Sequence, residues 1–219
     1  MSRISPLRRW LIKNHLFSLD KNYTHLLLDG GKLNIPENMY DDFLKKYASD
    51  ITKGHKNYIC ESKTPIFKMH ADLDFYQDSG LSSNEIIKYT KTIQEIIGTN
   101  YNILDPISRR VIICTTDPVE KIKNNKKCIK TGIHLIWPSI YVNKNIATNI
   151  RNILVHYFED KYGERKDNNT WNDVIDETVY KQNGLRMIGS SKMIKCKECR
   201  GLAKKKNNCK HCFGKGSVD

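Results

Sequence analysis

No stretch of this 219-residue sequence is apolar enough to cross a membrane. Its apolar runs are at most four residues long, whereas a membrane-spanning helix needs about 20 residues. The N-terminus, residues 1–9, is basic, but no apolar stretch of signal-peptide length follows it. We therefore expect an intracellular protein that is neither secreted nor inserted in a membrane.

Acidic residues are scarce relative to basic ones. The chain has 24 Asp and Glu against 37 Lys and Arg, which gives a formal net charge of +13. Such an excess favours a polyanionic partner, nucleic acid before a membrane surface. Apolar residues still make up 39% of the chain, enough for a packed core. No internal repeat and no P-loop segment of the form G-x-x-x-x-G-K-[ST] occurs.

The seven cysteines do not form the even set that a disulfide framework needs. Three are scattered, and the other four form two C-x-x-C pairs: Cys196, Cys199, Cys209 and Cys212. Without a secretion signal, this spacing indicates metal ligation in a reducing compartment. Four thiolates suit a structural, tetrahedral Zn²⁺ site, with an iron-containing site as the competing interpretation.

The C-terminal segment also differs in charge from the rest of the chain. Residues 192–219 hold nine basic residues and two acidic ones, and a run of lysines (Lys204, Lys205, Lys206) lies between the cysteine pairs. Such a basic shell suits a nucleic-acid backbone, although a zinc staple that merely ends the domain is the alternative. We therefore divide the chain into a domain at 1–192, in which 1–65 carry no assignable motif, and a zinc segment at 193–219.

The remaining pattern alternates between helical and strand periods. We expect a first helix from Met39 to about Ile51, with Asn38 as its cap and with Phe43, Leu44 and Tyr47 on one face. A second helix should follow the Ser82/Glu85 capping box and end at Gly98. A third is expected over Lys144–Tyr162. Strands are expected at 66–75, 109–116, 132–138 and 185–189, and less clearly at 172–177. Residues 121–130 and 163–170 read as polar loops. This mixture predicts an α/β or α+β fold with a central sheet.

A pair of carboxylates stands on the first of these strands. Strict alternation over residues 68–75 directs Met69, Ala71, Leu73 and Phe75 to one face. His70, Asp72 and Asp74 then point to the other. Two carboxylates on one face repel each other unless a cation lies between them, and hard divalent ions prefer such oxygens. A solvated pair on an edge strand is the alternative.

Three further segments carry groups that suit phosphates or a metal ion. On the strand at 132–138, His134 shares a face with Gly132 and Lys130, and both basic side chains can bind a phosphate. Asp176, after two β-branched residues, could complete the metal site. The last segment offers cations and small hydroxyls to an anion: Arg186, Ser190, Ser191 and Lys192. Each signal alone is equally compatible with an ordinary structural residue.

In this order and spacing, the four segments resemble the archaeo-eukaryotic primase superfamily. The nearest branch resembles the primase-polymerases and the primase part of D5-type primase-helicases of large DNA viruses. The resemblance covers about residues 66–192 and rests on Asp72-Leu73-Asp74, Gly132-Ile133-His134, Val174-Ile175-Asp176 and the basic segment that ends at Lys192. The family's serine falls on Gly132, which removes a hydroxyl contact and leaves the backbone amide.

The resemblance implies a fold, a chemistry and a set of roles. It implies a primase-like catalytic core with an RRM-like sheet, in which Asp72, Asp74 and Asp176 hold two Mg²⁺ or Mn²⁺ ions. His134 and Lys130 would contact the incoming nucleotide, and its triphosphate would meet the basic segment: Arg186, Ser190, Ser191 and Lys192. The expected activity is template-dependent synthesis of short primers on single-stranded DNA from NTP or dNTP, for DNA replication.

Two other functions compete with a primase. One is a non-catalytic zinc protein that binds single-stranded nucleic acid on a primase-like fold. The other is a glycosyltransferase that uses a nucleotide sugar, because D-x-D with a divalent ion also serves that chemistry. The resemblance further implies a viral origin, a location in the host cytoplasm or nucleus, and a replicative helicase in cis or in trans. We expect either an excised N-terminal portion of a primase-helicase or a stand-alone protein.

Overall fold

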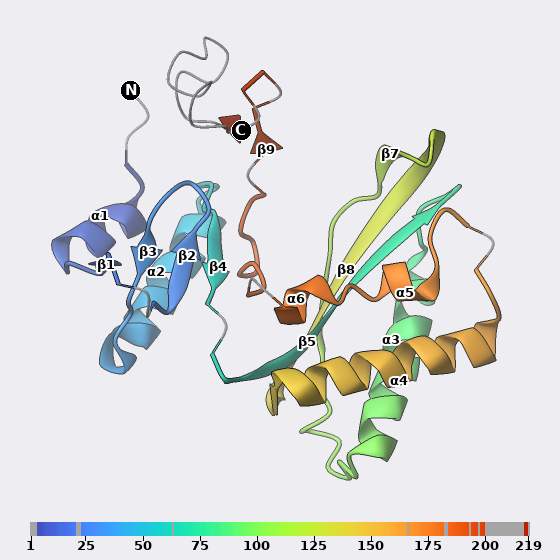
Figure 1. The fold of residues 1–219 in the computed structure, drawn as a ribbon. Helices are drawn as coiled ribbons and strands as arrows, with labels where there is room; N and C mark the ends of the chain where they lie inside the picture. The colour runs from blue at the N-terminus through green and yellow to red at the C-terminus, as the bar shows by residue number, and fades with distance from the viewer. Residues whose placement is uncertain are drawn as a thin grey trace. The chain divides into compact units, whose positions relative to one another are not determined.

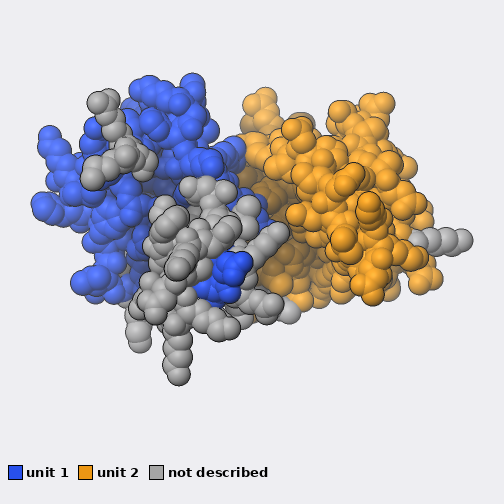
Figure 2. All heavy atoms as spheres, turned by 90° about the horizontal axis from the view of Figure 1, so that it is seen from above, with its two compact units in different colours: residues 1–62, 184–219 blue, residues 63–183 orange. Residues whose placement is uncertain are grey.

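The computed structural model describes residues 4–20, 23–62, 64–165, 167–181, 184–192, 194–196, 198–199 and 217–218. The chain divides into two compact units (Figure 2). The terminal unit takes residues 1–62 and 184–219, and the central unit takes residues 63–183. Among the described residues, no helix is both long and apolar enough to cross a bilayer. The architecture is mixed α+β, with an antiparallel four-stranded sheet in each unit.

The central unit is built on a sheet whose long middle strand pairs on both edges (Figure 1). Its strands are β5 (Ile66–Gln77), β6 (Ile112–Thr115), β7 (Val119–Lys123) and β8 (Lys126–Asn143). The order is β5-β8-β6, and β7 also pairs with β8. On the outer edge of β5, Leu73 forms a single antiparallel bridge with Ile175. A segment that lies 102 residues after Leu73 in the sequence thus adds one bridge to the edge of this sheet.

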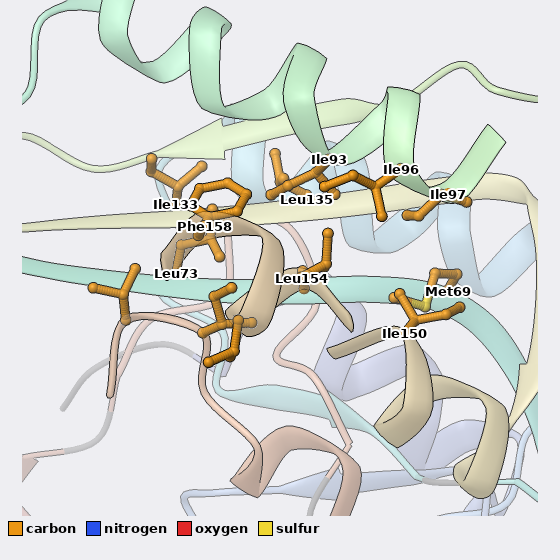
Figure 3. Packing of buried hydrophobic residues seen from close by; sticks show 14 of the residues in the cluster. Met69, Leu73, Ile93, Ile96, Ile97, Ile133, Leu135, Ile150, Leu154 and Phe158 are labelled. Carbon is orange, nitrogen blue, oxygen red and sulfur yellow. The ribbon is translucent and has the colours of Figure 1, made fainter. Parts of the chain in front are cut away.

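Two long helices, α3 (Ser83–Asn100) and α4 (Lys144–Tyr162), supply the core of this unit. Side chains from both helices meet the inward-facing residues of β5 and β8 (Figure 3). Along β8 the inward side chains are fully buried: Ile133, Leu135 and Trp137. Burial of each such side chain contributes about 2 kcal/mol relative to exposure. One face of the sheet is therefore committed to the core, as the alternation in the sequence predicts.

The ends of these helices follow local sequence signals. The Ser82/Glu85 capping box is confirmed, since each side chain accepts a hydrogen bond from the other residue's backbone N–H. After α4, Gly163 has a φ of 74°, which suits glycine at a helix end. The expected exit at Gly98 is wrong, because α3 continues to Asn100. Gly98 instead leaves room for the side chain of Arg109, which would lie 3.0 Å from an added Cβ.

The terminal unit holds the second four-stranded sheet, in the order β1-β3-β2-β4. Its described elements are α1 (Pro6–Lys13), β1 (Phe17–Ser18), β2 (His25–Leu27), β3 (Lys32–Leu33), η1 (Glu37–Met39), α2 (Tyr40–Thr52) and β4 (Ile59–Glu61). A separate two-stranded sheet pairs β9 (Ile194–Lys195) with β10 (Ser217–Val218). The predicted Asn38 cap is wrong, because Asn38 lies inside η1 and α2 begins at Tyr40. Phe43 and Tyr47 are buried as predicted, but Leu44 is exposed.

Three other local predictions are corrected. Residues 121–130 form a hairpin rather than a loop, because Asn124 and Asn125 both adopt positive φ, as a type I′ turn requires. The strand expected at 172–177 is mostly helix α5 (Trp171–Val174), which begins at a Thr170/Asp173 capping box. The strand expected at 185–189 shrinks to one bridge between Arg186 and Cys60, because Gly189 turns the chain at a φ of 80°. Helix α6 (Thr178–Lys181) was not predicted.

The terminal unit contains a buried neutral histidine, His25, which gives its stability a pH dependence. The side chain is 2% exposed, and its Nε2 atom has no hydrogen-bond partner among the described residues. Burial lowers the pKa of His25 from 6.5 to about 4, against the opposing effect of Glu61. Below pH 6.5 the unfolded chain takes up a proton that the folded chain refuses until about pH 4. Stability therefore falls over this window, by up to about 3 kcal/mol.

This prediction is tested by urea unfolding of the native chain and a His25→Phe variant. Phenylalanine fits the aromatic neighbours of His25, whose ring centroid lies 4.8 Å from that of Phe43. Between pH 7 and pH 5 we expect the native chain to lose about 2 kcal/mol more unfolding free energy than the variant. Equal losses in the two proteins would show that His25 titrates normally in the folded state.

Candidate active site

The face of the central sheet opposite its core carries the predicted acidic and basic residues. The antiparallel register of β5 and β8 pairs Asp72 with His134, Asp74 with Gly132, and Tyr76 with Lys130. Directly paired residues point to the same face of a sheet. Two carboxylates of β5 and two basic side chains of β8 are therefore neighbours, because both strands keep their alternation across the whole segment.

Side-chain contacts join the two strands at this point. Lys130 Nζ donates to Asp74 Oδ2 at 2.6 Å, and His134 Nε2 lies 3.3 Å from Asp72 Oδ1. The side chains of Asp72 and Asp74 are 18% and 27% exposed, so solvent reaches both. A Cβ added at Gly132 would lie 3.4 Å from Asp74 Oδ1, an ordinary contact. The glycine at the position of the family's serine thus leaves one side of Asp74 uncovered.

Asp176 is held against the edge of β5 by its backbone. Its N–H donates to the carbonyl of Asp72 at 2.9 Å, next to the bridge between Leu73 and Ile175. Its carboxylate accepts hydrogen bonds from the backbone N–H and the hydroxyl of Thr178, at 2.8 and 2.7 Å. The third acid predicted from the sequence therefore lies beside the strand that carries the first two.

Mutual repulsion among these acids is visible in the electrostatics of Asp74. Burial raises the pKa of Asp74 above its usual value, and the charges of Asp72 and Asp176 act in the same direction. The ammonium group of Lys130 opposes them through its hydrogen bond and its charge. The site thus concentrates more negative charge than one lysine compensates.

The donor set fits hard divalent cations. Asp72 Oδ1 is buried and accepts no hydrogen bond from any described residue, and the basic group beside it is His134 Nε2 at 3.3 Å. Carboxylate oxygens are the ligands that Mg²⁺ and Mn²⁺ prefer. In the described part of the chain, no three His, Cys, Asp or Glu side chains lie together as a ready-made cluster. Both carboxylate oxygens of Asp176 accept hydrogen bonds from Thr178. The prediction that Asp176 is a third metal ligand therefore rests on its position at the edge of β5.

Comparison with known proteins identifies the family. Residues 24–200 match the family described as the C962R protein N-terminal AEP domain. The chain belongs to this family. AEP denotes the archaeo-eukaryotic primases, so the resemblance drawn from the four sequence segments is confirmed. No curated protein matches the chain.

The extent of the match adds to what the motifs indicate. The AEP domain begins at residue 24, so most of the N-terminal part that carried no recognisable motif belongs to it. It ends at residue 200, after Cys199 and before Cys209. The family's domain thus spans the whole central unit and parts of both segments that make up the terminal unit.

The basic segment of the AEP domain belongs to the terminal unit. Arg186 pairs with Cys60 and donates from Nη1 to the Ser190 carbonyl at 3.4 Å. The hydroxyl of Ser190 accepts from the Ile59 N–H and donates to the Asn57 carbonyl, and the Ser191 N–H also donates to Asn57. These contacts tie the segment to β4 and the residues before it. A role in nucleotide binding for Arg186, Ser190, Ser191 and Lys192 stays a prediction.

Half of the predicted zinc site can be described. Cys196 and Cys199 are buried, at 0% and 2% exposure. Cys209 and Cys212 lie outside the described residues. The paired strands β9 and β10 bring Lys195 opposite Ser217, so the two ends of the cysteine segment meet. The zinc site itself stays a prediction.

Asn169 is a supporting residue that sequence reasoning missed. Its side chain is buried, donates from Nδ2 to the Asp74 carbonyl at 2.7 Å, and accepts from the Tyr76 N–H at 3.2 Å. One amide thus bonds to the backbone of β5 as a neighbouring strand would. No local signal marks Asn169, because the contact joins positions 95 residues apart.

Arg151 is a second supporting residue. It is 5% exposed, and its guanidinium donates from Nε to the Ile175 carbonyl at 3.0 Å and from Nη2 to the Asn172 carbonyl. These bonds hold the segment that brings Asp176 to β5. The sequence contains a signal here, since Arg151 falls on the buried face of α4 with Ala147 and Val155. A charged residue among the core-facing positions of a helix indicates a buried hydrogen-bond partner, because an unpaired charge is costly to bury.

Proposed function

We propose that this AEP domain is a template-dependent primase or primase-polymerase that makes short primers on single-stranded DNA for replication. The observation that supports the proposal is the cross-strand arrangement of Asp72 and Asp74 with His134 and Lys130, and the backbone bond from Asp176 to Asp72. Acids gathered from separate segments and flanked by cations suit the transfer of a nucleotide, whose triphosphate is itself negatively charged.

In this proposal Asp72, Asp74 and Asp176 hold two Mg²⁺ or Mn²⁺ ions. When bound, the ions supply the positive charge that activates the attacking 3′ oxygen and stabilises the leaving pyrophosphate. His134 and Lys130 orient the phosphates of the incoming NTP or dNTP by donating hydrogen bonds. The cations and hydroxyls of the basic segment are proposed to bind the triphosphate: Arg186, Ser190, Ser191 and Lys192.

The topology of the central unit is consistent with the RRM-like core expected of a primase. The chain runs β5, α3, β6, the β7–β8 hairpin and α4 before Ile175 returns to the free edge of β5. The spatial order is then Ile175, β5, β8, β6. An RRM-like sheet has the same order, with the two central strands presenting functional side chains on the face away from the helices.

Primer synthesis on unprimed single-stranded DNA tests the proposed function. Labelled NTP and dNTP are supplied in parallel with Mg²⁺ or Mn²⁺, and a nucleotide sugar serves as the competing substrate. We expect short labelled products that depend on both the template and the metal. DNA binding without any product would favour a non-catalytic binding protein. Transfer of the sugar alone would favour a glycosyltransferase.

A structural Zn²⁺ ion completes the proposal at the C-terminus. The pairing of β9 with β10 brings together the two ends of the sequence segment that contains both C-x-x-C pairs, and its four cysteines suit a tetrahedral site: Cys196, Cys199, Cys209 and Cys212. The basic residues around the cysteines suit contact with the template backbone. A replicative helicase, in cis or in trans, and an intracellular viral setting belong to the same proposal.

Metal analysis checks the zinc site directly. We expect one Zn²⁺ per native chain and its loss in a Cys199→Ser variant, because three thiolates no longer close the coordination shell. The loss is expected to weaken binding to single-stranded DNA, while Cys114→Ser, at a cysteine outside the segment, retains the metal. A metal-free native chain would contradict the site, and unchanged DNA binding after zinc loss would contradict its contact with the template.

A further inference from the structure

The β7–β8 hairpin (Figure 1) carries four lysines whose register places them on the same face of the sheet as the acids. The register pairs Lys121 with Cys128, Lys123 with Lys126, and Val119 with Lys130. Paired residues share a face, and alternation along β8 puts Lys126 and Lys130 on the face of Gly132 and His134. We call this set, Lys121, Lys123, Lys126 and Lys130, the lysine row.

Contacts with β5 support this assignment of the face. Lys123 Nζ lies 4.3 Å from the ring centroid of Tyr76, and Lys130 Nζ lies 5.5 Å from it. Tyr76 is two residues from Asp74 on β5, and Lys130 itself binds Asp74. The row is therefore continuous with the acidic site, and from Gly132 to Lys126 it extends roughly 20 Å along β8 at ~3.3 Å per residue.

The charge on this hairpin is unequal between its two faces, since Lys127 and Glu120 share the face opposite to the lysine row. Its one acid, Glu120, pairs with Ile129 and belongs to the opposite face. Beyond Gln77, the last residue of β5 to pair with β8, the tip from Lys121 to Cys128 pairs only with itself. Lys121 and Lys126 are exposed, and neither forms an ion pair within the described residues. Beyond Lys130, which is paired with Asp74, the lysine row thus presents positive charge without an ion-pair partner among the described residues.

We propose that the lysine row binds the backbone of the single-stranded nucleic acid that passes the acidic site. Cations two positions apart on β7 and four apart on β8 form a line that matches a linear polyanion, whereas a nucleotide triphosphate is too short to reach from Asp74 to the hairpin tip. Tyr76 adds an aromatic ring beside the row, a surface on which a base can stack. That this strand is the template rests on the proposed function.

The test compares two triple variants of the intact chain with equal loss of charge. The row variant carries Lys121→Gln, Lys123→Gln and Lys126→Gln, and leaves Lys130 unchanged because it contacts Asp74. The control carries Lys88→Gln, Lys91→Gln and Lys144→Gln, exposed residues of α3 and α4 in the same unit. Affinity for labelled single-stranded DNA is measured over a series of salt concentrations. A Lys→Arg triple variant at the row positions checks that charge, rather than lysine itself, is required.

We expect the row variant to bind about 10- to 100-fold more weakly, with its salt slope reduced by about 2, since each contact with a single strand contributes about 0.7. The control variant and the arginine variant should bind as the native chain does. Equal losses in the row and control variants, or an unchanged row variant, would overturn the inference.

Primer synthesis separates this inference from the function on which it rests. If the native chain makes no primers and the row variant loses DNA affinity, the binding surface is supported and the proposed enzyme activity is contradicted. If the native chain makes primers and the row variant binds DNA normally, the activity is supported and the binding surface is contradicted. Mn²⁺ affinity should be equal in the native chain and the row variant.

Discussion

Replacement of Asp72 with asparagine is expected to reduce primer synthesis by at least about 10³-fold. Asp72 contributes a buried carboxylate oxygen that accepts no hydrogen bond from the described residues and lies 3.3 Å from His134 Nε2 across the sheet. The amide keeps the size of the side chain and removes the charge, so the proposed divalent ion loses a carboxylate ligand. Mn²⁺ affinity, followed by electron paramagnetic resonance, should fall together with synthesis.

Asp78→Asn is the matched control for this prediction. Asp78 is exposed and follows the end of β5, so the same chemical change occurs six residues away with no place in the site. We expect normal synthesis and normal Mn²⁺ affinity in the control, and unfolding temperatures within a few degrees for both variants. Full synthesis by Asp72→Asn would mean that the metal centre is elsewhere.

Replacement of Arg151 with methionine is expected to lower the free energy of unfolding by about 3 kcal/mol. The change leaves the buried carbonyl of Ile175 and the partly buried carbonyl of Asn172 without their charged donor. Because these bonds hold the residues just before Asp176, Mn²⁺ affinity should also fall in the variant while it is still folded. Lys144→Met, an exposed cation on the same helix, should change neither quantity.

An Ile150→Ala variant distinguishes a positioning role for Arg151 from a loss of stability alone. Ile150 is buried next to Arg151 on α4, and its truncation costs about 2–5 kcal/mol through lost packing. We expect Ile150→Ala to lose stability and retain Mn²⁺ affinity. If both variants retained that affinity, Arg151 would be a structural residue only.

The sequence predicts the catalytic strands better than the segments that support them. Alternation along β5 and β8 is a local property, so the sequence alone assigns Asp72, Asp74 and His134 to faces of their strands that turn away from the core. Helices with strong caps, such as α3 and α4, are predicted for the same reason. The β7–β8 hairpin was missed because its strands are charged, and only the positive φ values at Asn124 and Asn125 reveal the turn.

The remaining features depend on contacts between distant parts of the chain. Asp176 reaches β5 through a single bridge and one backbone bond, and Val174 before it belongs to a helix rather than a strand. Asn169 acts through a backbone group 95 residues away and leaves no periodic signal, whereas Arg151 is marked as buried by its place on α4 but its partner, 24 residues away, is not. In the terminal unit, β4 pairs with the segment around Arg186, which lies more than 120 residues later in the sequence. The spacing of the motifs does not predict this pairing.

Anomalous diffraction from crystals of the native chain, grown with Mn²⁺ and a non-hydrolysable nucleoside triphosphate, would locate the metal ions and the nucleotide in one experiment. We expect manganese peaks beside the carboxylates of Asp72 and Asp74, with the triphosphate next to Lys130 and His134. Manganese bound only at other positions, or a triphosphate that contacts neither β5 nor β8, would contradict a nucleotidyl-transfer centre on this sheet.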